Sequence, residues 1–328
     1  MNLLRYAPAL LVAAVAVATP LILGQTAYVM SLVIASLTIA GIAVAWALLG
    51  NLGGLVSFGH AAFFGVGAYT SALLAMKLQW PVLLCLPMGG LGAVLASVLT
   101  LPALRLRGPY FALAILAYAH IFKILAVEAE PLTGGAGGLL SIPTFPTVFG
   151  VNLGTKTGAY VLILAIVVLS GLAYAAIRRS PTGLALRAMH DSELATRVVG
   201  VPSTRLKALM LMVSAFITGV VGAFNAHQIG FLEPDYAFAS IWTVLPIAAA
   251  IFGGYRTVWG PAIGAVVVYL VDQLVFKEWL PGGHQIIFGL LLGGMILFSP
   301  RGLAPLVQRL TTPARANVLP AEVAHAGR

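Results

Sequence analysis

The chain has 328 residues, of which 60% are hydrophobic and only 8% are charged. A soluble globular domain carries about 25% charged residues, so this composition excludes a single aqueous domain and indicates a protein embedded in lipid. The formal net charge is +9, but the basic residues are scattered among apolar runs without stacking aromatics, which argues against nucleic-acid binding.

In chain order, the sequence predicts an all-α membrane protein: a polytopic helical bundle of about ten (8–10) transmembrane helices, since an apolar run of roughly 20 residues can cross a bilayer. The first run follows Arg5 and leads into the second without a convincing cleavage site, so we expect an uncleaved span rather than a signal peptide. The third and eighth runs are Gly-rich or short, so each can span fully, be broken or be re-entrant. The predicted runs are residues 8–24, 27–49, 54–76, 81–101, 110–127, 159–177, 208–228, 240–254, 258–276 and 285–298.

The distribution of charge predicts that both ends of the chain lie in the cytoplasm. Basic residues favour the cytoplasmic side of a membrane protein. When Arg5 is placed inside and the chain crosses once per run, most basic residues fall inside and five acidic residues fall outside. The residues placed inside are Arg105, Arg107, Arg178, Arg179, Arg187, Arg197, Arg205, Lys207, Arg256, Arg301 and Arg309, and those placed outside are Glu128, Glu130, Glu233, Asp235 and Glu278. Three lysines, Lys77, Lys156 and Lys277, are exceptions because they fall outside.

Two polar stretches interrupt the apolar runs. Residues 128–158 are rich in Gly, Pro and Thr and are predicted to form an external loop. Residues 178–207 lie inside, and apolar residues recur there among charges at roughly helical spacing. This spacing predicts an amphipathic helix or helix pair at the membrane surface. A simple connecting loop is the alternative, but the length and patterning favour a docking element.

Two Gly pairs belong to segments that show a weak internal sequence similarity. Gly53 and Gly54 precede one Gly-rich run, and Gly253 and Gly254 precede another. Transporters often contain internal repeats whose Gly-rich segments approach the substrate path. Chance alone, among Gly-rich helices, explains this similarity equally well.

The sequence contains no energy-coupling motif of its own. None of its five lysines follows a glycine, so the chain has no phosphate-binding G-x-x-x-x-G-K-[ST] loop. If ATP drives transport, the motor is therefore another chain. Ion coupling usually places carboxylates inside spans, and Asp272 is the one plausible intramembrane acid. A Na⁺ site built from carbonyls and hydroxyls would leave no such trace.

Catalytic and metal sites receive little support. Ser57 and His60 would be neighbours on a helix, but no third group is evident to orient them as a nucleophile and base. The six histidines are widely dispersed, and the single cysteine, Cys85, excludes a disulfide framework and a multi-cysteine metal site.

A cluster of polar residues opens the third run. Polar groups at membrane depth are costly, and they tend to face a cavity or to pair between helices. Helix packing is the simpler interpretation for each residue alone. As a cluster, Asn51, Ser57, His60 and Tyr69 are the candidate lining of a translocation path.

The chain resembles a known family over nearly its whole length. Five stretches in the same order carry the resemblance: residues 51–70 (NLGGLVSFGHAAFFGVGAYT), 104–113 (LRLRGPYFAL), 132–139 (LTGGAGGL), 180–188 (SPTGLALRA) and 252–261 (FGGYRTVWGP). They resemble the high-affinity branched-chain amino acid permeases, specifically the M-type subunit.

The resemblance implies the ABC importer permease fold and a transport subunit that is not itself an enzyme. It implies a homologous H-type permease subunit, two cytoplasmic ATP-binding subunits that carry ATP and Mg, and a periplasmic or extracellular solute-binding protein. This chain would bind no cofactor or metal, would contact membrane lipid and no nucleic acid, and would be a multi-pass protein of the bacterial inner membrane. Residues 1–310 would form the transmembrane permease domain, and residues 311–328 a cytoplasmic tail.

The resemblance also assigns a role to residues 178–207. This stretch resembles the coupling loop with which importer permeases dock on their ATPases. The candidate coupling residues are Arg187, Asp191, Glu193, Ala195 and Gly200, of which Glu193, Ala195 and Gly200 match the acidic, small and glycine pattern of that loop.

The resulting expectation is import of branched-chain or related amino acids by alternating access. The near alternative is a permease for urea, short amides or aromatic acids, because closely similar permeases carry these solutes. An ion-coupled secondary carrier and an intramembrane enzyme are the alternatives from other classes.

Overall fold

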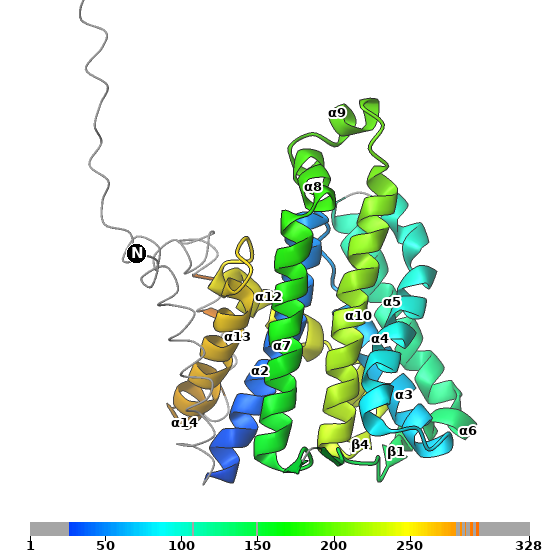
Figure 1. The fold of residues 1–328 in the computed structure, drawn as a ribbon, viewed down its shortest axis with the longest axis vertical. Helices are drawn as coiled ribbons and strands as arrows, with labels where there is room; N and C mark the ends of the chain where they lie inside the picture. The colour runs from blue at the N-terminus through cyan, green and yellow to red at the C-terminus, as the bar shows by residue number, and fades with distance from the viewer. Residues whose placement is uncertain are drawn as a thin grey trace, which may run out of the picture.

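A computed structural model describes residues 26–279, except Arg107 and Phe149, and six further positions, 283, 286, 289, 290, 293 and 294 (Figure 1). The predicted run 8–24, most of the run 285–298 and the predicted tail 311–328 lie outside the described residues. So do Arg5, Arg301 and Arg309.

Seven helical segments of the described part are long and apolar enough to cross a membrane. They are α2 (Ala27–Leu52), α4 (Val82–Leu99), α5 (Pro109–Glu128), α7 (Lys156–Arg179), α10 (Ser203–Ile229), α11 with α12 (Pro234–Ala237 and Ile241–Gly253), and α13 with the π-helical turn η3 and α14 (Gly260–Val271, Asp272–Phe276 and Lys277–Trp279). The predicted run 54–76 contains a further helix, α3 (His60–Lys77), which is not among the seven. The polytopic helical fold is thus confirmed, whereas the total of ten spans stays a prediction.

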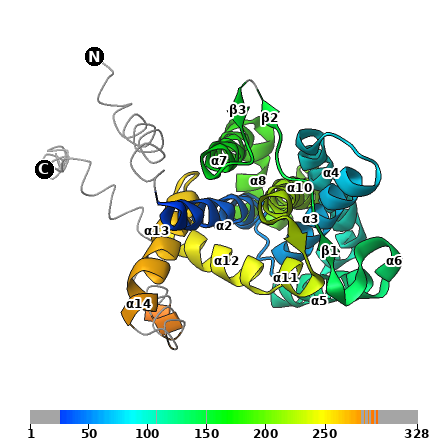
Figure 2. The same ribbon diagram turned by 90° about the horizontal axis from the view of Figure 1, so that it is seen from below.

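Helix α2 forms the centre of the bundle. Its apolar residues surround the helix on all sides, as expected of a helix that is buried all round. Accordingly, the most apolar stretch of α2 is almost completely buried. It packs against α7, α10, α12 and α13, and Figure 2 shows it between these neighbours.

Helices α3, α4 and α10 pack closely through glycines. A Cβ added at Gly89 would lie 2.6 Å from the Gly67 carbonyl oxygen and 2.8 Å from Ala223 Cβ. A Cβ added at Gly67 would collide with the backbone of Gly219. Small residues allow such close approach of helices in membranes, where lipid provides no hydrophobic driving force between them.

Two His–Ser hydrogen bonds tie α3 to α10 along the same contact. His60 Nε2 lies 2.9 Å from Ser214 Oγ, and Ser71 Oγ lies 2.9 Å from His227 Nε2. Ser214 Oγ already donates to the Ala45 carbonyl at 2.8 Å, so His60 Nε2 is the donor in the first pair. His227 Nδ1 lies 2.6 Å from the Pro143 carbonyl, which can only accept, so its Nε2 accepts from Ser71.

The run that contains α3 is broken rather than continuous. Residues 53–59 are not helical, and Gly54 has a left-handed backbone with φ of +65°. This segment starts beside α8 at one end of the bundle, and Lys77 at the end of α3 donates to the Pro131 carbonyl at the other end. The run therefore reaches from one end of the bundle to the other as an extended segment followed by a helix.

The two Gly pairs of the weak internal similarity both lie at helix breaks. Gly53 and Gly54 follow α2, while Gly253 ends α12 and Gly254 follows with φ of +98°. The two breaks are neighbours in space, because Asn51 Nδ2 donates to the Arg256 carbonyl at 3.3 Å.

The predicted loop 128–158 contains more structure than its composition indicated. It includes α6 (Glu130–Thr133), the 3₁₀ turn η2 (Gly135–Gly137), β1 (Leu139–Leu140), β2 (Thr147–Val148) and β3 (Val151–Asn152). Strand β1 pairs antiparallel with β4 (Phe231–Leu232), and β2 pairs with β3. We call this end of the molecule, with β1–β4, the β end (Figure 1).

Outside this loop, another 3₁₀ turn, η1 (Leu101–Arg105), follows α4.

Residues 178–207 contain a helix pair, as predicted, while its place at the membrane surface stays a prediction. The pair consists of α8 (Pro181–Asp191) and α9 (Glu193–Val198). The Ser180 side chain accepts from the Gly183 N–H and caps α8, and the Ser192 side chain accepts from the Ala195 N–H and caps α9. Both helices project past the bundle at the end opposite the β end, which we call the α9 end (Figure 1).

Candidate coupling and translocation sites

The α9 end presents exposed apolar side chains. Leu194 is 78% exposed, Val198 87% and Val199 76%. These residues lie beyond the bundle, around a helix that Ser192 holds in place by its cap. An apolar tip of this kind, rimmed by charges, is typical of a contact surface for another protein.

Glu193 forms two ion pairs, one within α9 and one that joins α9 to α10. Its Oε1 lies 2.7 Å from Arg197 Nη2, and its Oε2 lies 2.9 Å from Lys207 Nζ on α10. Arg197 Nε also donates to Ser203 Oγ at 2.8 Å. The hydrogen bond from Lys207, followed by its charge and by Arg197, holds the pKa of the Glu193 carboxyl below its usual range despite some desolvation.

The other predicted coupling residues occupy different positions around the pair. Arg187 Nη2 donates to the Arg178 carbonyl at 2.7 Å and so ties α8 to the end of α7. Asp191 and Ala195 are exposed, and the Ala195 N–H donates to the Ser192 cap. Gly200 adopts φ of +84° between α9 and α10, which explains a glycine at this turn. Their contacts with a partner stay a prediction.

A small cavity lies beneath the pair. Its volume is about 270 Å³. It is lined by Leu52, Gly53, Gly54, Leu186, Met189, His190, Glu193 and Lys207. The helix pair therefore borders the break between α2 and α3, so a displacement of α8 and α9 would bear directly on that break.

The four residues predicted to line a path are packed between helices in this structure. Asn51 Nδ2 donates to Tyr174 Oη at 2.6 Å, and His60 is fully buried against Ser214. Tyr69 is buried and its ring stacks on Phe238, with centroids 6.0 Å apart. Their role in translocation stays a prediction.

The hydroxyl of Ser57 is bonded within its own segment. Ser57 precedes α3 instead of sharing a helix with His60, so the expected helical neighbourhood is wrong. Its Oγ accepts from the Gly59 N–H at 3.2 Å, and its carbonyl accepts from Trp46 Nε1 at 3.0 Å. The hydroxyl and carbonyl thus stabilise the extended segment. Among the described residues, no group of three His, Cys, Asp or Glu side chains could hold a metal ion.

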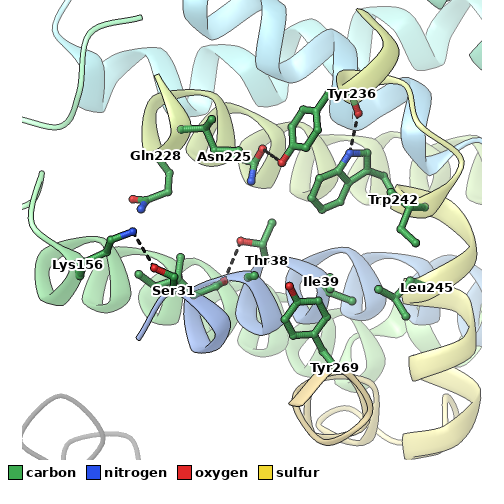
Figure 3. Close-up of a pocket in the computed structure, with 14 residues that line it drawn as sticks. Ser31, Thr38, Ile39, Lys156, Asn225, Gln228, Tyr236, Trp242, Leu245 and Tyr269 are labelled. Carbon is green, nitrogen blue, oxygen red and sulfur yellow. Dashed lines mark hydrogen bonds between the residues drawn. The ribbon is translucent and has the colours of Figure 1, made fainter. Parts of the chain in front are cut away.

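A larger cavity opens near the β end. Its volume is about 530 Å³, within the range of small-molecule sites. The lining residues come from α2, α7, α10, α11, α12 and α13 (Figure 3). They are Ser31, Ile34, Ala35, Thr38, Ile39, Lys156, Asn225, Gln228, Ile229, Tyr236, Ile241, Trp242, Leu245 and Tyr269.

Hydrogen bonds fix several polar groups of this cavity. Lys156 Nζ donates to Ser31 Oγ at 2.8 Å. Tyr236 Oη donates to Asn225 Oδ1 at 2.9 Å, and Trp242 Nε1 donates to the Tyr236 carbonyl at 2.8 Å. The sequence did not predict this cavity. One signal could have indicated it, because Lys156 is one of three lysines that the predicted topology places outside.

Comparisons with known proteins agree with the resemblance. The family model "Branched-chain amino acid transport system / permease component" matches residues 28–300. The chain is 30% identical over 284 residues to the high-affinity branched-chain amino acid transport system permease protein LivM of Salmonella typhimurium, a match that covers 79% of this chain and 65% of that protein. The LivM protein of Escherichia coli gives the same identity and coverage.

More distant relatives carry similar names. The probable branched-chain amino acid transport permease protein LivM of Methanocaldococcus jannaschii is 22% identical over 245 residues, which cover 70% of this chain and 69% of that protein. The matches to the LivM proteins of Salmonella typhimurium and Escherichia coli cover a little under two thirds of the length of those proteins. No solved structure matches the chain.

Proposed function

We propose that the chain is the membrane-spanning permease subunit of an ATP-binding-cassette importer for branched-chain or related amino acids. The premise is that the chain belongs to the family of branched-chain amino acid transport system permease components. The relatives LivM are named as permeases for these solutes, and the chain is a multi-pass membrane protein by its helices and family. The observation that carries the proposal is the α8–α9 pair, a capped and ion-paired element with an exposed apolar tip.

The proposal assigns the remaining components to other chains. A homologous permease subunit completes the membrane pathway, and two cytoplasmic ATPases with ATP and Mg dock at the α9 end. A solute-binding protein delivers amino acids at the β end, on the outer side of the bacterial inner membrane. Ten spans with both ends of the chain in the cytoplasm complete this arrangement, which follows the positive-inside pattern.

The mechanism is alternating access driven through α8 and α9. Closure of the ATPases moves the pair as a rigid body. The motion passes to the bundle because α8 continues from α7, with the added bond from Arg187 to the Arg178 carbonyl, and because Glu193 bonds Lys207 on α10. The break between α2 and α3 lies directly beneath the moving pair. In the alternate state, we expect the polar residues Asn51, Ser57, His60 and Tyr69 to become accessible along the path.

Uptake by the complete importer tests the proposal. The chain is co-reconstituted in liposomes with the proposed second permease, ATPases and binding protein of the same importer. We expect ATP-dependent uptake of leucine, isoleucine and valine, and little uptake of urea or propionamide. Uptake that persists without ATP and stops when the proton gradient is collapsed would instead show an ion-coupled carrier.

A further inference from the structure

Among the described residues that line the cavity near the β end, Lys156 is the one with a charge (Figure 3). None of the described residues that line the cavity is acidic. Among the described residues, no carboxylate lies within ion-pair distance of Lys156, whose described hydrogen-bond partner is the neutral Ser31 hydroxyl. The described part of the cavity wall therefore has an excess of one positive charge.

The location of Lys156 makes this charge unusual. A lysine at the outer end of a span opposes the positive-inside pattern, so such a residue needs a local reason. The two other exceptions have local contacts outside this cavity. Lys77 donates to the Pro131 carbonyl at 2.9 Å, and Lys277 to Gln273 Oε1 at 3.4 Å. Lys156 instead points into a cavity large enough for an amino acid.

The wall of the cavity changes character along its length. Gln228 lies beside Lys156 at one end, whereas Trp242 and Leu245 lie at the far end (Figure 3). The indole of Trp242 is fixed by its hydrogen bond to the Tyr236 carbonyl and by stacking on Phe64, with centroids 4.3 Å apart. A rigid apolar wall opposite a cation complements a small solute with a carboxylate at one end and an aliphatic side chain at the other.

We propose that this cavity is a solute-binding site of the permease itself, in which Lys156 binds the α-carboxylate of an aliphatic amino acid and Trp242 with Leu245 contacts its side chain. The inference rests on the proposed function and adds to it the residues that recognise the solute. It also excludes urea and neutral amides as good ligands of this site, because they carry no carboxylate to balance Lys156.

Uptake kinetics of three lysine variants test the site in the complete reconstituted importer. Lys156→Gln should raise the KM for leucine by about tenfold or more, because a charge-assisted hydrogen bond is lost. Lys156→Arg should restore most of the affinity. Lys277→Gln is the matched control, since it removes an outer lysine outside the cavity, and its KM should equal that of the wild type.

The outcomes separate this site from the proposed function. If the wild-type importer does not take up leucine, the proposed function fails. If the wild type takes up leucine and Lys156→Gln leaves KM unchanged, only the binding site fails.

If a Lys156 variant does not assemble into the importer, a direct binding measurement tests the site instead. Gln228→Cys adds a thiol to the cavity of a chain whose single cysteine, Cys85, is buried. With Lys156 intact, millimolar leucine should slow alkylation of this thiol, and leucinamide, which has no carboxylate, should not. Equal protection by both compounds, or protection by neither, would overturn the assignment.

Discussion

At the residue scale, Glu193 is the predicted coupling residue with the most informative contacts. The resemblance indicated an acidic residue at this position, and the structure shows what the charge does inside the chain. Its carboxylate bonds Arg197 within α9 and Lys207 on α10. The sequence could predict the pair with Arg197, four residues on along a helix. The pair with Lys207 depends on how α9 folds back on α10, which spacing alone does not predict.

Reversing this charge should uncouple transport. We expect Glu193→Lys to abolish ATP-dependent uptake while the protein still inserts, because three cations would repel one another where α9 meets α10. Uptake and membrane yield are measured in parallel. The double variant Glu193→Lys with Lys207→Glu restores one ion pair and should recover part of the uptake. Normal uptake in the single variant would remove Glu193 from the coupling role.

The same cluster predicts a pH dependence. Because the native pKa of Glu193 lies below its usual value, its ion pairs contribute stability at pH values above the unfolded pKa, and this contribution is lost as pH falls through the lower native pKa. Hydrogen-exchange protection of the α9 amides, corrected for intrinsic exchange, should stay constant from neutral pH to the usual range of glutamate and fall below it. Glu193→Gln should show weaker protection without this pH step. An identical pH step in that variant would assign the effect to another group.

At the element scale, the contact of α3 with α4 and α10 depends on glycines. Gly219→Leu should destabilise the bundle by about 1–3 kcal/mol or more, since its side chain would displace Ala93 and the backbone of Gly89 and Gly90. Thermal unfolding in detergent measures the loss. Gly137→Ala is the control, because no atom lies within 4 Å of its added Cβ. Equal melting temperatures for both variants would contradict close packing at this contact.

Apolar runs predicted the long helices of the described part, and the Gly-rich composition of the third run allowed for a break. The sequence did not place that break before α3. The run 54–76 is apolar with several glycines, and this composition does not fix where a helix begins. Side chains of other helices hold this region: Trp46 donates to the Ser57 carbonyl in the extended start, and Thr243 accepts from the Ala61 N–H in the first turn of α3. The pairing of β1 with β4 was unpredictable for a similar reason, because two-residue strands carry no pattern and their partners are far apart in the chain.

At the scale of the whole molecule, the two ends have different chemistry. The α9 end carries a charged, apolar-tipped helix pair, and the β end carries short strand pairs and a cavity with one cation (Figure 1). The sequence predicted the first of these, because the helix pair is local and continuous. It could not predict the cavity, since the lining residues belong to six helices and form no motif. The sequence indicated only that the predicted topology places Lys156 outside, where basic residues are less common.

The central claim is that another chain drives this bundle through α8 and α9. Cross-linking from Leu194→Cys on the exposed face of α9 to the ATPase subunit tests it most directly, with Leu140→Cys at the β end as the control. We predict that a thiol cross-linker joins the α9 variant to the ATPase and leaves the control free. A fully active, ATP-driven importer in which the α9 variant forms no adduct with the ATPase would contradict the account.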